Sequence, residues 1–400
     1  MTTPVTVIGA GLSGLATAWY LAERGARVRV LEAASRPGGL IQTVHTREGL
    51  VETAARAFPW SDRTAALFEA MDIAPQFARD ESKRRYIFRD GRARRWPLTP
   101  FETAGAAARL GRAWVGRQVR PRGRETVADW GARVFGPSAT TWLLAPALQG
   151  IYAAPPADLS ATALFGKGRA PRGKVAAPDA GMGALIARLC ERLQQRGVIF
   201  EFDRPVTADD LDRSAATVIC TSAPAASALL APLAPAVSAA IGRIRMVSVV
   251  VATAFFAPHE TDLRGFGVLF PRSSGVRALG AVFNADVFHG RGDLRSETWI
   301  YGDLDPDQLP GTDDELVAVV GRDRERLAGR PAVPVALHVT RQIRALPVYD
   351  GAVLDAQDAL DDLPAHVTLA GNYLGRLGVS SLLIGAAEAA QHVTRVGMAA

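Results

Sequence analysis

The feature that most limits what this 400-residue chain can fold into is a glycine-rich turn near its start. An apolar run ending at Ile8 is followed by the pattern G-x-G-x-x-G, formed by Gly9, Gly11 and Gly14. A helical pattern comes next, and a second apolar run leads to Glu32. A strand, a tight turn, a helix and a second strand with an acidic residue at its end together predict a Rossmann-type dinucleotide-binding unit.

Each residue of this unit has a distinct expected role. Gly9 permits the tight turn, Gly11 lets the backbone approach a pyrophosphate, and Gly14 lets the helix pack closely on the strand. The helix N-terminus, where Ser13 lies, offers free N–H groups and a partial positive charge to phosphate oxygens. Glu32 can accept hydrogen bonds from a ribose diol and would repel a 2′-phosphate.

The residues after the second strand separate FAD from NAD as the cofactor. The pattern E-x-x-x-R-x-G-G comprises Glu32, Ala33, Arg36, Gly38 and Gly39. It resembles the flavoprotein superfamily of amine oxidases, carotenoid desaturases and protoporphyrinogen oxidases. In that superfamily the paired glycines approach the FAD phosphates and ribose a second time, and the arginine helps to neutralise the phosphates. The resemblance therefore implies an FAD site.

Two later segments extend this resemblance. Val206 stands where family members make a backbone contact near the adenine. Val367 to Ala390 reads as a strand, a glycine loop and a helix whose N-terminus would offer N–H groups to the flavin pyrimidine. The cofactor-binding residues implied there are Gly371, Val379, Ser380 and Leu383.

A narrower resemblance, to the protoporphyrinogen/coproporphyrinogen oxidase family, begins with a basic hairpin after Lys83. The hairpin turns at Asp90-Gly91 and fits the family pattern R-x-x-x-x-x-G-x-x-x-x-x-P, which ends here at Pro97. In that family the leading arginine pairs with a substrate propionate, and Arg85 is the matching residue. The planar fork of arginine can hold a carboxylate at two points.

Two further segments carry the same resemblance. Residues 144–165 match the family pattern P-x-x-x-G-[IV]-[YF]-A-G-x-x-x-x-L-S, and by pattern alone they read as a loop between helices with an apolar tip. Residues 265–288 match the run G-F-G-x-L-x-P and the position of a later aromatic residue. The substrate-binding residues that the resemblance implies are Arg85, Gly150, Tyr152, Leu269 and Phe288.

Charge and composition bear on partners and compartment. The net charge is +6, but residues 83–124 alone hold thirteen Lys and Arg against two acidic residues. This segment reads as helical and carries Phe101 and Trp114, so it suits either an anionic membrane surface or an arginine-covered soluble subdomain. Two cysteines without a metal-binding spacing favour a reducing compartment and no metal site.

From these features we expect a cytoplasmic protein that is either soluble or bound peripherally to the cytoplasmic membrane face, and that does not bind nucleic acid. The chain enters its first strand at once, which predicts no secretory leader. The longest uncharged run, residues 214–242, is interrupted by prolines and predicts no membrane span.

The elements predict an α/β protein with three parts. A Rossmann-type FAD-binding domain is expected in three pieces, residues 1–82, 176–230 and 360–400. Residues 83–175 form an inserted basic helical, membrane-binding subdomain, and residues 231–359 form an antiparallel-sheet substrate domain. Within the last, Met246 to Phe256 is a continuous apolar run that predicts a buried strand.

As a divergent and short member of the protoporphyrinogen/coproporphyrinogen oxidase family, the chain is expected to oxidise protoporphyrinogen or coproporphyrinogen to the porphyrin. The resemblance implies that a hydride passes from a bridge carbon of the macrocycle to flavin N5 and that molecular oxygen reoxidises the flavin. No general base is visible in the sequence, so catalysis would depend on orientation.

Two alternatives stay open. The first is another activity of the superfamily, on an amine or a polyene. Amine oxidases carry a G-E pair where this chain has Gly371-Asn372, which argues against an amine oxidase. A flavin-binding paralogue without turnover is the other. Ala154 and Ala386 stand where the family usually has glycine, as does an alanine in the segment Val51 to Phe58, which in relatives runs beneath the flavin.

Overall fold

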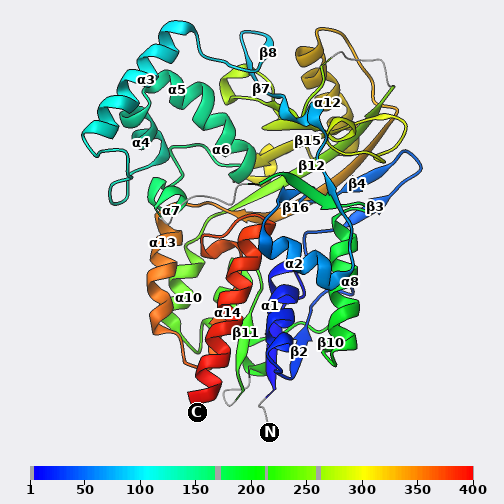
Figure 1. The fold of residues 1–400 in the computed structure, drawn as a ribbon, viewed down its shortest axis with the longest axis vertical. Helices are drawn as coiled ribbons and strands as arrows, with labels where there is room; N and C mark the ends of the chain where they lie inside the picture. The colour runs from blue at the N-terminus through cyan, green and yellow to red at the C-terminus, as the bar shows by residue number, and fades with distance from the viewer. Residues whose placement is uncertain (1–3, 167–172, 212–214, 258–262, 400) are drawn as a thin grey trace.

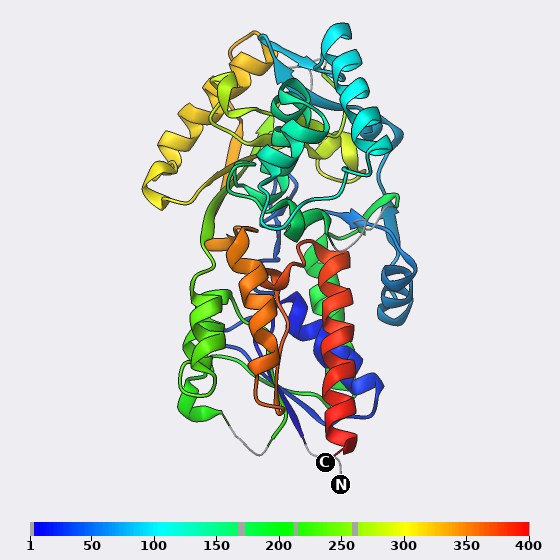
Figure 2. The same cartoon turned by 90° about the vertical axis from the view of Figure 1, so that its left-hand side faces the viewer.

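The computed structural model describes residues 4–166, 173–211, 215–257 and 263–399 and consists of two stacked parts (Figure 1). The lower part contains a five-stranded sheet, and both chain ends lie at its far end. The upper part contains a seven-stranded sheet. The view turned by 90° shows the same two parts along the long axis (Figure 2).

The five-stranded sheet confirms the predicted Rossmann-type unit. Its order is β10-β2-β1-β11-β17 and all neighbours run parallel. The strands are β1 (Val5–Ile8), β2 (Val28–Leu31), β10 (Ile199–Glu201), β11 (Thr217–Ile219) and β17 (Val367–Leu369). A parallel sheet is stable only when both faces are covered. One hydrophobic cluster joins it to α1 (Leu12–Glu23), α2 (Asp62–Met71), α8 (Met182–Gln195) and α14 (Val379–Ala399), and a second to α9 (Ala223–Leu230), α10 (Pro235–Gly242) and α13 (Gly351–Asp358).

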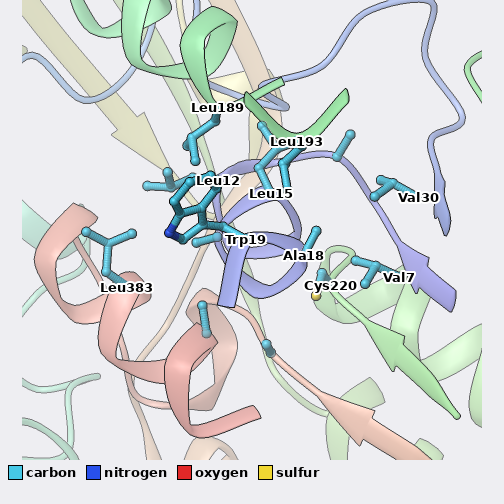
Figure 3. Close-up of a cluster of buried hydrophobic side chains, with 14 of the residues drawn as sticks. Val7, Leu12, Leu15, Ala18, Trp19, Val30, Leu189, Leu193, Cys220 and Leu383 are labelled. Atoms are coloured by element: carbon cyan, nitrogen blue, oxygen red, sulfur yellow. The ribbon is translucent and has the colours of Figure 1, made fainter. Parts of the chain in front are cut away.

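Helix α1 is the centre of the first cluster. Most of its residues are buried, which explains why it is apolar around most of its circumference. Side chains of three helices meet around it: Leu15, Trp19, Leu189, Leu193 and Leu383 (Figure 3). Ala386 of α14 is fully buried in the same cluster, so this core accommodates the alanine.

The seven-stranded sheet has the order β16-β12-β15-β14-β13-β7-β8. Its strands are antiparallel except for the parallel pair β13 and β7. The bounds are β7 (Arg85–Arg89), β8 (Arg92–Arg94), β12 (Met246–Phe256), β13 (Gly267–Leu269), β14 (Gly280–Phe283), β15 (Arg295–Asp303) and β16 (Ala336–Pro347). The basic hairpin therefore extends the same sheet as the predicted substrate strands.

Strand β12 is buried at every residue, as its apolar run predicts. Alternate side chains of a strand point to opposite faces. Val250, Ala252 and Phe256 belong to a cluster with helix α12 (Asp313–Ala328). Val249 and Val251 belong to another cluster, with the helical subdomain. Both faces of the sheet are therefore covered, and the two polar residues of the strand, Ser248 and Thr253, are buried and hydrogen-bonded.

The helical subdomain lies beside this sheet, and α3 is its outermost helix (Figure 1). Its helices are α3 (Pro100–Val115), α4 (Val127–Val134), α5 (Pro137–Ala139), the π-helical η2 (Thr140–Leu144), α6 (Ala145–Tyr152) and α7 (Ala161–Phe165). Thr99 and Glu102 form a capping box that starts α3. None of the described helices is long and apolar enough to cross a bilayer.

Helix α6 corrects one expectation, because residues 145–152 were expected to form a loop. Pro146 lies in the first turn, where a proline costs no hydrogen bond, and Ala153 ends the helix in the left-handed conformation with φ +54°. Helix α6 follows η2 directly, so the chain stays helical from Pro137 to Tyr152.

Short elements complete the fold. The hairpin strands β3 (Thr43–His45) and β4 (Leu50–Glu52) pair with each other, and β5 (Phe58–Pro59), β9 (Val175–Pro178) and β6 (Pro75–Phe77) form a small sheet. The remaining helical turns are α11 (Asn284–Val287), η1 (Asp80–Lys83), η3 (Ala208–Asp210), η4 (Arg272–Ser274), η5 (Pro306–Gln308), η6 (Ala359–Asp362) and η7 (Asn372–Leu374).

A buried ionic network ties α12 to the seven-stranded sheet. Glu297 of β15 accepts hydrogen bonds from Arg295 Nε at 2.8 Å and from Arg324 Nε at 3.1 Å. All three side chains are at most 4% exposed. The Arg324 guanidinium also lies 3.8 Å from the centre of the Phe256 ring. Buried charges of this kind are tolerated only when they are paired.

We predict that Glu297→Gln lowers the free energy of unfolding by about 3–5 kcal/mol, because it removes the buried charge that the Arg295 and Arg324 guanidinium groups share. Glu191→Gln is the matched control, since Glu191 pairs with Arg188 on the surface and surface pairs contribute about 0–1 kcal/mol. Urea unfolding followed by circular dichroism measures both. Equal losses in the two variants would contradict this account of the network.

Candidate active site

The three glycines of the first turn have different surroundings. Gly9 has φ +99°, and a Cβ there would lie 2.9 Å from the carbonyl oxygen of Cys220. A Cβ on Gly14 would overlap the carbonyl oxygen of Gly9, so both positions exclude a side chain for reasons of packing. Gly11 has an ordinary φ of −68°, and among the described residues beyond its neighbours in the chain no atom lies within 4 Å of where its Cβ would be. Open space at this glycine is what a bound pyrophosphate requires.

Helix α1 begins directly beside this open space. Its N-cap is Gly11, which has no side chain to cap the helix, and Ser13 lies in the first turn. The first N–H groups of a helix have no partner within the helix. They are therefore available to phosphate oxygens at this point, and the turn fits the FAD pyrophosphate.

Glu32 lies at the end of β2 and joins the two glycine segments. Its carboxylate accepts hydrogen bonds from the N–H of Ala10 at 2.6 Å and of Ala34 at 2.9 Å. Ala10 in turn accepts a hydrogen bond from the N–H of Gly38 at 2.8 Å. Each carboxylate oxygen has a second lone pair, so Glu32 can still accept from a ribose hydroxyl.

The second glycine pair lies against the first. Gly38 forms an isolated parallel bridge with Gly11, and a Cβ on Gly39 would lie 3.3 Å from the Gly11 Cα. Arg36 is exposed and donates hydrogen bonds to the carbonyl oxygens of Pro37 and Gly39, so it holds its own loop. The structure thus brings together the glycines predicted from both motifs.

Ala33 and Val206 lie on neighbouring segments at the same sheet edge. Ala33 is exposed beside Glu32. The N–H of Arg204 donates to the carbonyl oxygen of Glu32 at 2.9 Å. This hydrogen bond holds the segment that contains Val206 beside the loop after β2. Ligands of such sheets bind outside the carboxyl ends of the strands, and this is where these residues lie.

The C-terminal residues contribute backbone rather than side chains. Val379 and Leu383 are buried in the core around α1, and the Ser380 hydroxyl donates to the carbonyl oxygen of Pro59 at 2.8 Å. Gly371 precedes η7, and a Cβ there would lie 2.6 Å from the Tyr373 ring. The free N–H groups at the start of α14 are what this segment can offer a flavin.

Three of the predicted substrate residues lie close together on the upper part. Strands β7 and β13 pair with Arg85 opposite Gly267 and Ile87 opposite Leu269. A Cβ on Gly150 of α6 would lie 2.5 Å from Leu269 Cδ2, so the helix and the strand meet at this glycine. The ladder therefore connects Arg85 with the contact between Leu269 and Gly150.

Aromatic residues surround this group. Arg85 is exposed, and its guanidinium lies 4.6 Å from the centre of the Phe266 ring. Phe266 packs against the small cluster that contains Phe288, which is only 4% exposed. The ring of Tyr152 lies 5.0 Å from that of Tyr349. Phe266 and Tyr349 were not among the predicted site residues; their position beside predicted residues becomes apparent only in the folded chain.

We predict that Gly11→Val folds normally but is purified without FAD, because the added side chain enters open space that the pyrophosphate needs. Gly14→Ala instead costs about 1–3 kcal/mol of stability or more, since its Cβ overlaps the Gly9 carbonyl. Flavin absorbance per protein and the melting temperature separate the two effects. Gly105→Val in α3, where space is also open, should retain FAD. A full flavin complement in Gly11→Val would refute this site.

Comparison with known proteins agrees with this geometry. Residues 12–393 match the family described as flavin containing amine oxidoreductase. The chloroplastic protoporphyrinogen oxidase of Nicotiana tabacum is 26% identical, over 97% of this chain and 85% of its own length. The chloroplastic protoporphyrinogen oxidase of Oryza sativa subsp. japonica is also 26% identical, over 97% of this chain and 87% of its own length.

Solved structures show the same fold. A protein from Exiguobacterium sp. 255-15, provisionally assigned as a protoporphyrinogen oxidase, superposes with a TM-score of 0.82 at 18% identity over the whole of both chains. Cyclohexylamine oxidase from Brevibacterium oxydans IH-35A superposes with a TM-score of 0.73 at 18% identity, and the match covers 99% of each chain. The family match over nearly the whole length, together with the glycine site, identifies the chain as an FAD-dependent oxidoreductase that belongs to the flavin containing amine oxidoreductase family.

Proposed function

We propose that this enzyme dehydrogenates a porphyrinogen to a porphyrin, with molecular oxygen as the electron acceptor. The observation that carries the proposal is the state of the Arg85 side chain. Its guanidinium is exposed and stacked on Phe266, and no carboxylate lies within ion-pair distance of it among the described residues. Relatives named protoporphyrinogen oxidase, similar over 97% of this chain, support the same substrate class.

The surroundings of Arg85 suit a flat apolar ligand that carries a carboxylate. Leu269 and Gly150 supply an apolar contact along the β7–β13 ladder. A guanidinium can bind a carboxylate through two parallel N–H···O bonds. Such a pair sets the orientation of the ligand, while the apolar residues supply contact area.

When bound, FAD supplies the hydride acceptor and passes the electrons to oxygen. The residues of the chain contribute orientation and exclusion of water. Burial raises the pKa of Tyr152 and of Tyr349 above that of an ordinary phenol, so both stay neutral at physiological pH and neither serves as a general base. The pyrrole N–H protons of a porphyrinogen would then leave to water.

The test of this function uses the FAD-loaded enzyme with protoporphyrinogen, coproporphyrinogen and cyclohexylamine in parallel. Porphyrin fluorescence reports turnover, and bleaching of the flavin absorbance without oxygen reports reduction by any of the three. Bleaching by a porphyrinogen supports the proposal. Bleaching by the amine alone would replace it with amine oxidation.

Within this assay, Arg85→Ala should lower kcat/KM by roughly ten- to a hundredfold, the equivalent of a charge-assisted pair of about 1.5–3 kcal/mol. FAD content should not change. Arg85→Lys should recover only part of the loss, because an ammonium cannot make the bidentate contact. Arg92→Ala, an exposed arginine of the same hairpin, is the matched control.

A substrate with esterified propionates should be nearly indifferent to Arg85→Ala, since it has no carboxylate to lose. If the Arg85→Ala enzyme turns over the free acid as fast as the wild type, Arg85 is a surface arginine and not a substrate ligand.

We further propose that helix α3 binds an anionic membrane surface. Phe101 is 89% exposed, Trp114 74% and Val115 77%, and the helix belongs to the strongly basic segment 83–124. Exposed aromatic and apolar side chains among arginines are typical of helices that lie in the plane of a membrane interface. Each basic residue near an anionic surface contributes about 1 kcal/mol.

The double variant Phe101→Ser/Trp114→Ser should bind anionic phosphatidylglycerol vesicles on the order of tenfold more weakly, because the two side chains no longer enter the interface. Added salt should weaken the binding of the wild type. Val333→Ser, which alters an exposed apolar residue after α12, is the control and should bind normally. Equal cosedimentation with neutral and anionic vesicles would exclude the electrostatic contribution.

A further inference from the structure

Two arginines near the junction of the short hairpin and helix α8 have buried nitrogens without a hydrogen-bond partner. Within the described residues, Nη1 and Nη2 of Arg291 and Nε and Nη2 of Arg56 donate a hydrogen bond to no oxygen. The Arg291 side chain is 4% exposed. Both guanidinium groups lie near Glu52, and its carboxylate attracts them electrostatically.

Glu52 does not satisfy these donors. Its oxygens already accept hydrogen bonds from the N–H of Met182 and the hydroxyl of Thr43, each at 2.8 Å, so the carboxylate caps helix α8. Arg291 Nη1 remains 4.0 Å from Glu52 Oε1, beyond hydrogen-bond distance.

A second carboxylate near Arg291 is that of Asp179. It is exposed and accepts a hydrogen bond from Gln76 Nε2 at 3.1 Å. The environment of the two arginines is strongly desolvated: burial lowers the pKa of Arg56 to about 10 and lowers that of Arg291, and burial raises the pKa of Glu52.

Buried charged N–H groups without acceptors are costly, and native proteins keep them where an additional group completes the hydrogen bonds. Four such donors on two planar forks match the geometry of a carboxylate. The cluster lies next to apolar surface, since the Arg291 guanidinium is 5.0 Å from the centre of the Phe288 ring.

The apolar surface connects this cluster to Arg85. Phe288 and Phe266 belong to one small hydrophobic cluster, which also includes Ala57, the neighbour of Arg56. Phe266 is the ring on which Arg85 stacks. Two arginine sites therefore border the same apolar cluster, one exposed and one buried.

We propose that Arg291 and Arg56 form a second carboxylate-binding subsite, which takes an acidic group of the same flat apolar ligand that Arg85 holds. The identity of that ligand as a porphyrinogen rests on the proposed function, whereas the subsite itself requires only a carboxylate. A ligand with two carboxylates would be held at two points, and an esterified ligand would lose both contacts.

The first experiment measures carboxylate binding without assuming the substrate. FAD-loaded wild type, Arg291→Met, Arg291→Lys and Arg56→Met are melted with and without sodium propionate, with sodium chloride at equal ionic strength as reference. Propionate should raise the melting temperature of the wild type. The increase should be smaller for Arg291→Met and Arg56→Met, and smallest for the double variant Arg85→Ala/Arg291→Met. Arg196→Met, which also removes an arginine from an aromatic ring, Trp19, should respond as the wild type does.

The second experiment uses protoporphyrin and its dimethyl ester, with binding followed by porphyrin fluorescence. Arg291→Met should weaken binding of the diacid about ten- to a hundredfold and leave the diester unchanged. Without ligand, Arg291→Met should melt at or above the wild-type temperature, because it removes a buried charge with unsatisfied donors. Arg291→Lys should be intermediate in diacid affinity.

Three results would overturn the subsite. If Arg291→Met loses FAD while propionate still raises its melting temperature as much as that of the wild type, the unpartnered Arg291 nitrogens bind the cofactor instead. A lower melting temperature with unchanged carboxylate binding would make Arg291 a structural partner of Glu52. An equal propionate effect in every folded arginine variant would exclude the site. If propionate stabilises as expected but protoporphyrin does not bind, the subsite stands and the porphyrinogen function fails.

Discussion

The contact on which the rest of this structure depends is the approach of helix α1 to the turn that precedes it. Gly14 lies so close to the Gly9 carbonyl that no side chain fits between them, and Gly9 in turn packs against Cys220 of the neighbouring strand end. These two contacts set α1 on the sheet with its uncapped N-terminus beside the open space at Gly11. The helix is then enclosed by α8 and α14, so segments far apart in the sequence pack together in one core behind the glycine turn (Figure 3).

Arginine is used in three physically distinct ways in this protein. Arg295 and Arg324 are buried and each donates a hydrogen bond to Glu297, which joins α12 to the sheet. Arg85 is exposed and stacked on an aromatic ring, so its charge is available to a ligand. Arg291 is buried, and two of its donors have no partner in the part of the chain that the structure describes, a state that is costly without an acceptor. Burial and partners, rather than residue type, therefore distinguish structural arginines from those proposed to bind substrate.

The fold itself does not choose a substrate. Structures of an amine oxidase and of a provisional protoporphyrinogen oxidase share it with this chain at 18% identity. In this chain the residues proposed to bind substrate are Arg85 on β7, Leu269 on β13 and Gly150 on α6, all carried by regular elements rather than by long loops.

The sequence by itself determined the features that local patterns encode: the strand–turn–helix unit at Gly9 to Gly14, the hairpin at Asp90-Gly91, and the buried strand Met246–Phe256. Only the tertiary structure decided that residues 145–152 are helical, that Val379 and Leu383 belong to the core, and that Arg56 and Arg291 meet at Glu52. The physical reason is that backbone conformation follows from neighbouring residues, whereas burial and hydrogen-bond partners depend on segments that meet only when the chain has folded.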